Sequence, residues 1–523
     1  MRIPLTSGAY TARSVISSAQ RCVNLFAEKN PPDSEVPFTY YNVPGLTHLA
    51  YPATSGQGRG LYWANSGALF YVCGNTVYYV SPSWVLTSLG TIGTSVNPVS
   101  MVDNGSNIVL VDGSANGYEI NLASHAMTPI NITNNSPPGP AVYAFYGADR
   151  VDILDGFILL NYPGTQTFYS TYDNEVVFDS TYFAEKNGYS DNLVAVIVTR
   201  RTIWLLGERT SEIWFNAGAP NFPFQIMPGP FIQHGCIAKY SVAQVDGAIF
   251  WLSQDQAGTF TIVRGEGFEV KPISNAAMEN EFASYPTVSD AIGLCFTMNG
   301  HTFYQITFPT ANKTWRWDER TPTLWHEAVW TDTNGNDNRH RANCAAWAYG
   351  KNVCADWQTG ELYAFDLNNH TDNGAPMQFR RGYPHMMKDG HQVIYCGFTL
   401  DVEAATSSDT VSVAGPFPVF TDPAPLIQTV DAGPVEDAIL AGPVPAGVNA
   451  QPLVNLRWSD TRGRTWGQPV PQTLGATGHY LAQPAWKRLG RARDRVFEVY
   501  GTIPGKIAIN GAFLDPEPIP MRN

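Results

Sequence analysis

The chain has 523 residues, which suits two or three domains better than one ordinary core. Charged residues make up only 15% and aromatic residues 12%, with 46 Gly and 38 Pro, a profile that favours short strands joined by turns and excludes helical bundles and disorder. The net charge of −13 argues against gripping DNA through its phosphates, because that needs clustered Lys and Arg. The charge fits either simple solubility or a surface that repels nucleic acid, and composition does not separate the two.

The N-terminus carries no signal-like apolar run, and no stretch approaches the roughly 18 apolar residues that would cross a membrane. We therefore expect a protein made and kept in the cytosol, unless it is exported as part of an assembly. The seven Cys residues are spread out and include no Cys-x-x-Cys, which predicts free buried thiols in a reducing compartment. A disulfide between Cys344 and Cys354, which flank one hairpin, is the less favoured alternative.

Residues 1–57 are irregular, with one strand-like piece, and lead into a repeated β-unit that fills residues 58–375. Each unit pairs an apolar strand with a second strand that carries Tyr, Phe or Trp, at a spacing of roughly 40 to 50 residues. The seven copies lie at 68–80, 107–120, 155–170, 201–215, 246–263, 295–306 and 345–365. The repeat predicts an all-β fold with a β-propeller of six or seven blades, depending on whether the first and last units complete one another.

The composition changes near residue 376. Strand patterns at 398–403, 453–458 and 495–500 predict a C-terminal antiparallel β-sandwich domain over residues 376–523. Between them, residues 404–450 are rich in Gly, Ala and Pro and are expected to form a loop insertion. The best helix candidate in the whole chain is 274–284, with Ser274 as its N-cap.

Searches for catalytic and metal-binding patterns lead to structural explanations. The Asp332–Asn338 run resembles a calcium loop but lacks the Gly and Glu that such loops require. The Ser459–Trp466 run resembles an Asp-box hairpin, which is itself a structural turn. No phosphate-binding loop, nucleophile elbow or paired His spacing is present. The sequence therefore predicts no catalytic, cofactor-binding or metal site and no enzyme.

The most distinctive charged stretch is Trp486–Arg495, which places five basic residues among ten in an otherwise acidic chain. A solvated turn before the strand at 495 explains some of these Arg residues but does not explain the Trp beside them. Contact with an acidic partner subunit, with Arg forming bidentate bonds to carboxylates, is the alternative, and nucleic acid is a weaker third. The candidate contact residues are Trp486, Lys487, Arg488, Arg491, Arg493 and Arg495.

Several stretches, taken in their order and spacing, are similar to one known family. The matching stretches are 23–28, 43–47, 58–62, 69–78, 398–403, 457–460, 464–466 and 486–493. The chain resembles the packaged-DNA stabilisation protein of short-tailed bacteriophages, the tail hub or nozzle, over nearly its full length. The insertion at 404–450 departs from that pattern.

The resemblance implies a structural virion protein of the tail. It implies a homo-hexameric ring below the portal–adaptor (head-to-tail connector) that extends the DNA channel, retains the packaged genome and serves in its ejection. The further partners implied are a tail needle or tip protein, tailspikes or fibres, and double-stranded DNA that passes through the lumen without sequence-specific binding. By the same resemblance, residues 1–57 and the C-terminal domain form a platform against the adaptor, while the propeller lies outward.

A function of a different class is also open at this point. A propeller could bind or cleave host polysaccharide, with aromatic residues such as Trp315 and Trp317 stacking on sugars. Burial of these two Trp residues in a blade core is the favoured explanation of them. Ring images would favour the tail hub, and carbohydrate hydrolysis by a monomer would favour the alternative.

Overall fold

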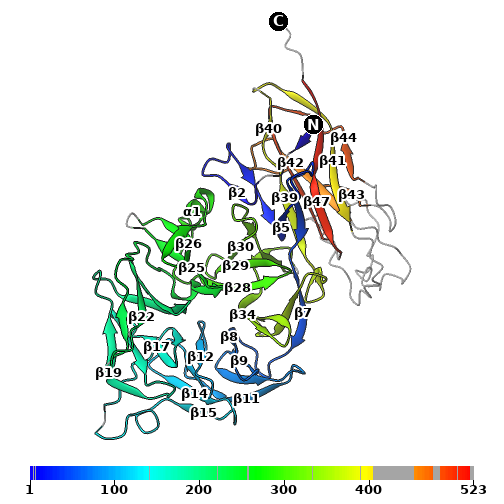
Figure 1. The fold of residues 1–523 in the computed structure, drawn as a ribbon. Coiled ribbons are helices and arrows are strands. Elements are labelled where there is room, and N and C mark those ends of the chain that lie inside the picture. Colours follow the sequence, from blue (N-terminus) through cyan, green and yellow to red (C-terminus); the bar gives the residue numbers. More distant parts are fainter. Residues whose placement is uncertain are drawn as a thin grey trace, which may run out of the picture.

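The computed structural model describes residues 1–523 except 4, 6, 141, 221, 256–257, 333, 389, 405–452, 475–482, 503–504 and 519–523. The described chain folds into a ring of antiparallel sheets and a second body built from strands near both ends of the chain (Figure 1). The ring is a β-propeller and the second body is a β-sandwich, as the repeat and the C-terminal strand patterns predicted.

Five units of the propeller form separate four-stranded sheets, each built from consecutive strands. The first holds β8 (Gly58–Trp63), β9 (Leu69–Cys73), β10 (Thr76–Val80) and β11 (Leu86–Thr91), and the second β12 (Ser100–Asp103), β13 (Asn107–Val111), β14 (Gly117–Asn121) and β15 (Met127–Pro129). The third holds β16 (Val151–Leu154), β17 (Phe157–Asn161), β18 (Thr167–Thr171) and β19 (Phe178–Glu185). The fourth holds β20 (Leu193–Thr199), β21 (Thr202–Gly207), β22 (Ser211–Asn216) and β23 (Phe224–Ile226), and the fifth β24 (Ala243–Val245), β25 (Ala248–Gln254), β26 (Phe260–Glu266) and β27 (Glu269–Pro272).

Two further units share their sheets with other parts of the chain. One holds β28 (Ile292–Met298), β29 (His301–Phe308), β30 (Lys313–Asp318) and β31 (His326–Glu327), and the other holds β34 (Ala342–Ala348), β35 (Lys351–Asp356) and β36 (Leu362–Asp366). A small hairpin, β32 (Val329–Thr331) and β33 (Asp337–Arg339), links them, and α1 (Ala276–Phe282) precedes β28. Within the described residues, seven sheet units thus close the ring.

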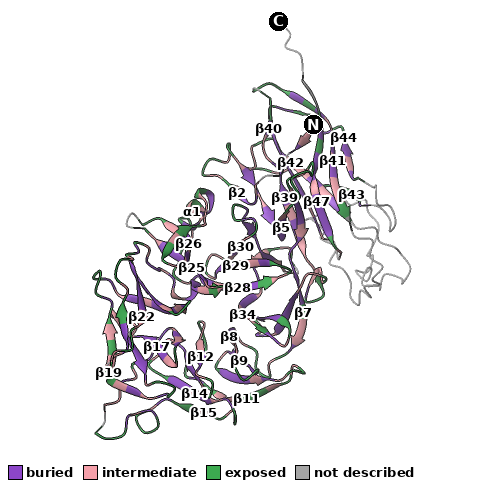
Figure 2. Ribbon diagram, in the orientation of Figure 1, coloured by how far each residue is buried: buried purple, intermediate pink, exposed green. Residues whose placement is uncertain are grey.

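Apolar side chains between neighbouring sheets hold the ring together. Seven clusters of buried residues each join consecutive units, and the last one joins the β34–β36 unit back to the first unit. In that last cluster, Val353 and Leu362 pack with Leu69 and Tyr71, all at most 1% exposed. The central strands are almost fully buried, because each sheet is covered on both faces (Figure 2). This burial explains why each repeat contains an apolar run in the sequence.

A strand from the N-terminal segment completes the last unit. β7 (Gly45–Ala50) pairs antiparallel with β36 and supplies its fourth strand, with Phe365 opposite Leu46. A short hairpin, β37 (Thr371–Asp372) and β38 (Ala375–Pro376), adds to the same sheet. A strand that precedes the repeat region therefore completes the last unit, whereas the first unit is complete by itself. At Gly45 a Cβ would lie 2.3 Å from the carbonyl oxygen of Asn369, so this close approach requires glycine.

The sandwich is made of two sheets that draw on both ends of the chain. One sheet has the order β44 (Ala485–Lys487), β41 (Val393–Ala404), β47 (Ile507–Pro518), β6 (Phe38–Asn42), β5 (Leu25–Lys29), with β1 (Arg2–Ile3) on β47 and β45 (Arg491–Ala492) on β41. The other contains β4 (Cys22–Val23), β39 (Gln378–Gly382), β46 (Asp494–Thr502), β42 (Leu453–Ser459) and β43 (Val470–Thr473), with β40 (Met386–Met387) on β46. The hairpin of β2 (Tyr10–Thr11) and β3 (Ala19–Gln20) stands beside it.

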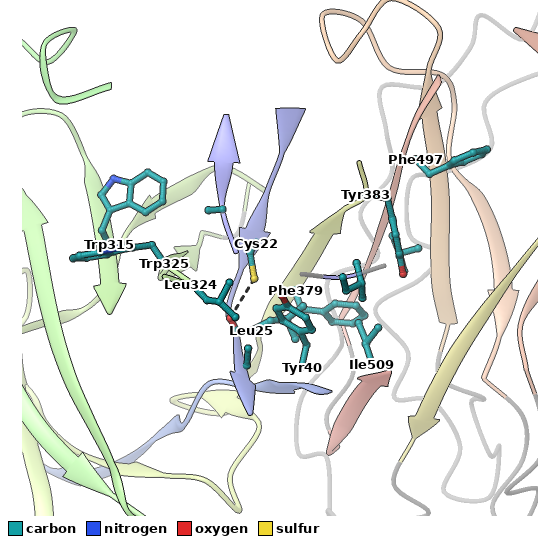
Figure 3. Packing of buried hydrophobic residues seen from close by; sticks show 14 of the residues in the cluster. Cys22, Leu25, Tyr40, Trp315, Leu324, Trp325, Phe379, Tyr383, Phe497 and Ile509 are labelled. Carbon is teal, nitrogen blue, oxygen red and sulfur yellow. Dashed lines mark hydrogen bonds between the residues drawn. The ribbon is translucent and has the colours of Figure 1, made fainter. Parts of the chain in front are cut away.

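β4 joins the propeller to the sandwich in one continuous sheet. Val23 pairs parallel with Glu327 of β31 on one side and antiparallel with Arg380 of β39 on the other. The core is continuous across this junction, because one cluster contains Trp315 and Trp325 of the propeller together with Phe379 and Phe497 of the sandwich (Figure 3). The two bodies therefore share apolar packing as well as a sheet.

Some local expectations are corrected or fall outside the described chain. The helix is shorter than 274–284, and its N-cap is Asn275, whose side chain accepts hydrogen bonds from Ala277 N and Met278 N, whereas the Ser274 hydroxyl donates to Glu279. The insertion predicted at 404–450 lies outside the described residues apart from Ala404, the last residue of β41. All seven cysteines are free thiols.

Candidate interaction surface

The basic stretch forms a sharply turned edge of the sandwich. β44 pairs with β41 through Trp486 and Phe398, and β45 pairs with the beginning of the same strand. Between them the chain turns through two positive-φ residues, Arg488 at 61° and Gly490 at 81°. The amide of Arg488 donates to the Cys396 carbonyl at 2.9 Å, which fixes the turn against β41. In Figure 1, β44 and β40 lie at the end of the sandwich remote from the propeller, near the N-terminus.

Two of the six predicted contact residues have buried side chains. Trp486 is 2% exposed, donates from Nε1 to the Val470 carbonyl at 2.7 Å and packs edge-on against Phe398. Arg495 is also 2% exposed and binds Asp460 through two N–H donors, at 2.6 and 2.8 Å. These two side chains stabilise the sandwich from within, so they are not available to a partner.

The other four residues, Lys487, Arg488, Arg491 and Arg493, form an exposed surface that we call the edge patch. Strand alternation explains it, because Trp486 and Ala492 face the core while Lys487, Arg491 and Arg493 face outward. None of the four side chains forms an ion pair with another residue of the described chain. Within the described residues the edge patch therefore presents four positive charges without an ion-pair partner, and its role as a contact remains a prediction.

The acidic residue within the stretch is neutralised internally. The carboxylate of Asp494 accepts from His385 Nδ1 at 2.8 Å and binds Arg462 Nε at 2.9 Å. Sequence reasoning missed this cluster, because its members lie up to 109 residues apart and no local pattern links them. Its consequence is that Asp494 does not reduce the charge that the edge patch presents.

The remaining sequence candidates are structural. Trp315 and Trp317 are 4% and 2% exposed and donate to the Tyr285 hydroxyl and the Pro322 carbonyl, so they belong to the core and cannot stack on sugars. Asp332 caps its own turn by accepting from the amides of Asn334 and Asn336. The Ser459 hydroxyl accepts from Gly463 N in the turn that follows β42.

The described residues contain no group of three or more His, Cys, Asp or Glu side chains arranged to hold a metal ion. No helix in the described chain is long and apolar enough to span a membrane.

Comparison with family models decides the relationship. The model described as bacteriophage P22 Gp10, beta-propeller, matches residues 1–370, and the model described as bacteriophage P22 Gp10, beta-sandwich, matches residues 431–517. The chain belongs to the bacteriophage P22 Gp10 family. This is the packaged-DNA stabilisation protein family that the sequence motifs indicated, and it makes the protein a structural tail protein of a phage virion.

The other comparisons add nothing to this assignment. No curated protein matches this Gp10-family chain. Among solved structures, the WD40 β-propeller domain of Doa1 is 11% identical with a TM-score of 0.38, over 62% of this chain and 97% of that one. The extracellular domain of a putative hybrid two-component system from B. thetaiotaomicron is 8% identical with a TM-score of 0.41, over 61% of this chain and 39% of that one. At such scores these likenesses say nothing about function.

Proposed function

We propose that this Gp10-family protein is the tail hub, or nozzle. In this role a homo-hexameric ring docks below the portal–adaptor, extends the DNA channel, retains the packaged genome and serves in its ejection. A needle or tip protein and tailspikes or fibres are the expected neighbours, and assembly takes place in the host cytoplasm. Membership of the family supports this role, and the edge patch is the observation that gives it a specific contact.

The edge patch suits docking onto an acidic protein surface. Its cations stand on a hydrogen-bonded turn, so little backbone freedom is lost when a partner binds. Guanidinium groups of Arg488, Arg491 and Arg493 can each bind a carboxylate through two parallel bonds, which adds geometric specificity to the charge attraction. Because the patch lies at the end of the sandwich remote from the propeller, docking there leaves the propeller free for other tail components (Figure 1).

The net charge of −13 fits passage of DNA through a lumen without sticking. An acidic wall repels phosphates that come within about 8 Å of it, which is the Debye length at physiological salt. Reversal of lumen Asp or Glu residues to Lys should slow ejection, and unchanged ejection across several such reversals would remove this part of the proposal.

Charge reversal in pairs tests the docking role. We expect K487E/R488E and R491E/R493E each to weaken co-assembly with the adaptor ring at least tenfold, with retained thermal stability. The matched control is K351E/R209E, which reverses two exposed propeller cations and should leave docking unchanged. Sedimentation and negative-stain microscopy report docking and six-fold rings. Wild-type docking by both edge-patch variants would exclude this surface, and a monomer that never forms rings with the adaptor would refute the hub itself.

A further inference from the structure

The N-terminal segment is held at two points by histidine rings. We call residues 10–29 the crossing segment, because it runs between the two bodies and includes β2, β3, β4 and β5. Through β4 it pairs with both the propeller and one sandwich sheet, and through β5 it enters the other sandwich sheet, where it pairs with β6. One histidine, His301 of the propeller, binds its far end, and another, His385 of the sandwich, binds its loop between β2 and β3.

His301 is bonded to an acceptor on each ring nitrogen. Nδ1 lies 2.6 Å from Asp318 Oδ2, and Nε2 lies 3.1 Å from Glu28 Oε1 in β5. Carboxylate oxygens only accept, so both bonds form only when both nitrogens carry a proton. The ring is 3% exposed, and Asp318 and Glu28 are the charged side chains in contact with it. Burial opposes the charged ring, but the bonds and charges of the two carboxylates outweigh it and raise the pKa of His301.

His385 shows the same arrangement with a backbone partner. Nδ1 lies 2.8 Å from Asp494 Oδ1, and Nε2 lies 2.8 Å from the carbonyl oxygen of Val15 in the crossing segment. A carbonyl oxygen also only accepts, so Nε2 donates to Val15. The charged groups that face it are Asp494 itself and Arg462, which binds the other Asp494 oxygen at 2.9 Å.

We propose that His301 forms a proton-dependent clamp that holds the crossing segment against the propeller, while His385 anchors the segment to the sandwich. When the His301 ring loses its second proton, one of its two bonds is lost, and the segment opens locally more often. The site is a conformational device built into the junction. It does not rest on the docking role of the edge patch, since neither histidine belongs to that surface.

The sign and size of the pH effect follow from linkage. In the open segment a free imidazole titrates near pH 6.5, whereas the clamped His301 holds its proton to higher pH. The clamp therefore contributes fully below about pH 6.5 and is lost as the pH rises through the raised value. The His301 ring changes the opening equilibrium by at most about tenfold per pH unit.

Cys22 is a natural reporter of this opening. Its thiol lies within β4 and is 1% exposed (Figure 3), and it is reached by a reagent only when the crossing segment opens. Cys236 in the propeller is 0% exposed and lies in a core cluster that contains no residue of the crossing segment, so it serves as an internal reference. The ratio of labelling at Cys22 to that at Cys236 cancels the general rise of thiol reactivity with pH.

The experiment labels the full-length protein with a thiol reagent between pH 6 and 8.5 and reads both cysteines by peptide mass spectrometry. We expect the ratio to rise several-fold per pH unit in the wild type. H301Q should raise the ratio at pH 6 and flatten its pH dependence, while H391Q, at an exposed histidine of the sandwich, should match the wild type. A wild-type ratio that does not change with pH would overturn the clamp, and so would a full pH slope in H301Q.

Discussion

Arg495 and Arg493 lie two residues apart in one basic stretch but should behave oppositely when their charge is removed. Arg495 donates two hydrogen bonds to Asp460 and one, at 2.5 Å, to the Leu489 carbonyl, and its guanidinium lies 4.9 Å from the Tyr395 ring centre. Substitution by Met keeps the apolar stem and removes all three bonds. Breaking a buried ion pair costs about 3–5 kcal/mol. Because the Asp460 side chain is 46% exposed and regains water, we expect the lower end of that range, about 3 kcal/mol.

The measurement is urea unfolding followed by Trp fluorescence, with the free-energy difference taken from the midpoint shift and the slope. R493M is the matched control, because Arg493 is exposed and should change stability by less than about 0.5 kcal/mol. In the docking assay the order reverses, since Arg493 belongs to the edge patch. Equal stability losses in the two variants, or a loss below about 1 kcal/mol for R495M, would refute the conclusion that Arg495 stabilises the fold while Arg493 belongs to the exposed edge patch.

Three further outcomes test other parts of the structure. L46A should destabilise the propeller by about 2–5 kcal/mol, because Leu46 is 1% exposed where β7 completes the ring. L453A, at a half-exposed site, should change the free energy of unfolding little. Equal losses of stability in the two variants would contradict closure of the ring by β7. Burial opposes the charge of Glu327, but Arg21 and Lys313 outweigh it and lower the pKa of Glu327. The stabilisation by this carboxylate is therefore present above about pH 4.3 and is lost as the pH falls. In E327Q the free energy of unfolding should decrease less steeply with falling pH, and an unchanged pH profile would disprove the pairing. Unfolding without reductant should expose seven titratable thiols per chain, and five would reveal a disulfide.

The propeller could be predicted from the sequence because its cause is local. Each repeat carries its own turn and two strands. Because the central strands are buried on both faces, each repeat contains an apolar run, such as Leu69–Cys73 or Thr202–Gly207, and this run recurs along the chain. The sandwich strands could be predicted for the same reason. The helix was placed correctly but capped one residue too early, since Ser274 and Asn275 are equally good caps by type.

The joining of these parts could not be predicted in that way. β7 and β36 are more than 300 residues apart, and β4 has only two residues, too few for any periodicity to show. Within the basic stretch, alternation of Trp486 with Lys487 is a local signal that the Trp points inward, and it was available from the sequence. Burial of Arg495 depends on Asp460, 35 residues away, so its role required the fold.

The arrangement of strands in the sandwich has a consequence for synthesis of the chain. Arg2 of β1 pairs with Phe513, and Tyr41 of β6 pairs with Ala508. The N-terminal strands, which are synthesised first, can therefore form this sheet only after the C-terminal strand β47 has been synthesised. Closing such long loops is slow, and the unpaired edges are exposed meanwhile. A chain cut short before residue 507 would lack β47, on which β41, β1 and β6 all pair. Truncated translation products would thus be unable to build the sheet of the sandwich that carries the edge patch.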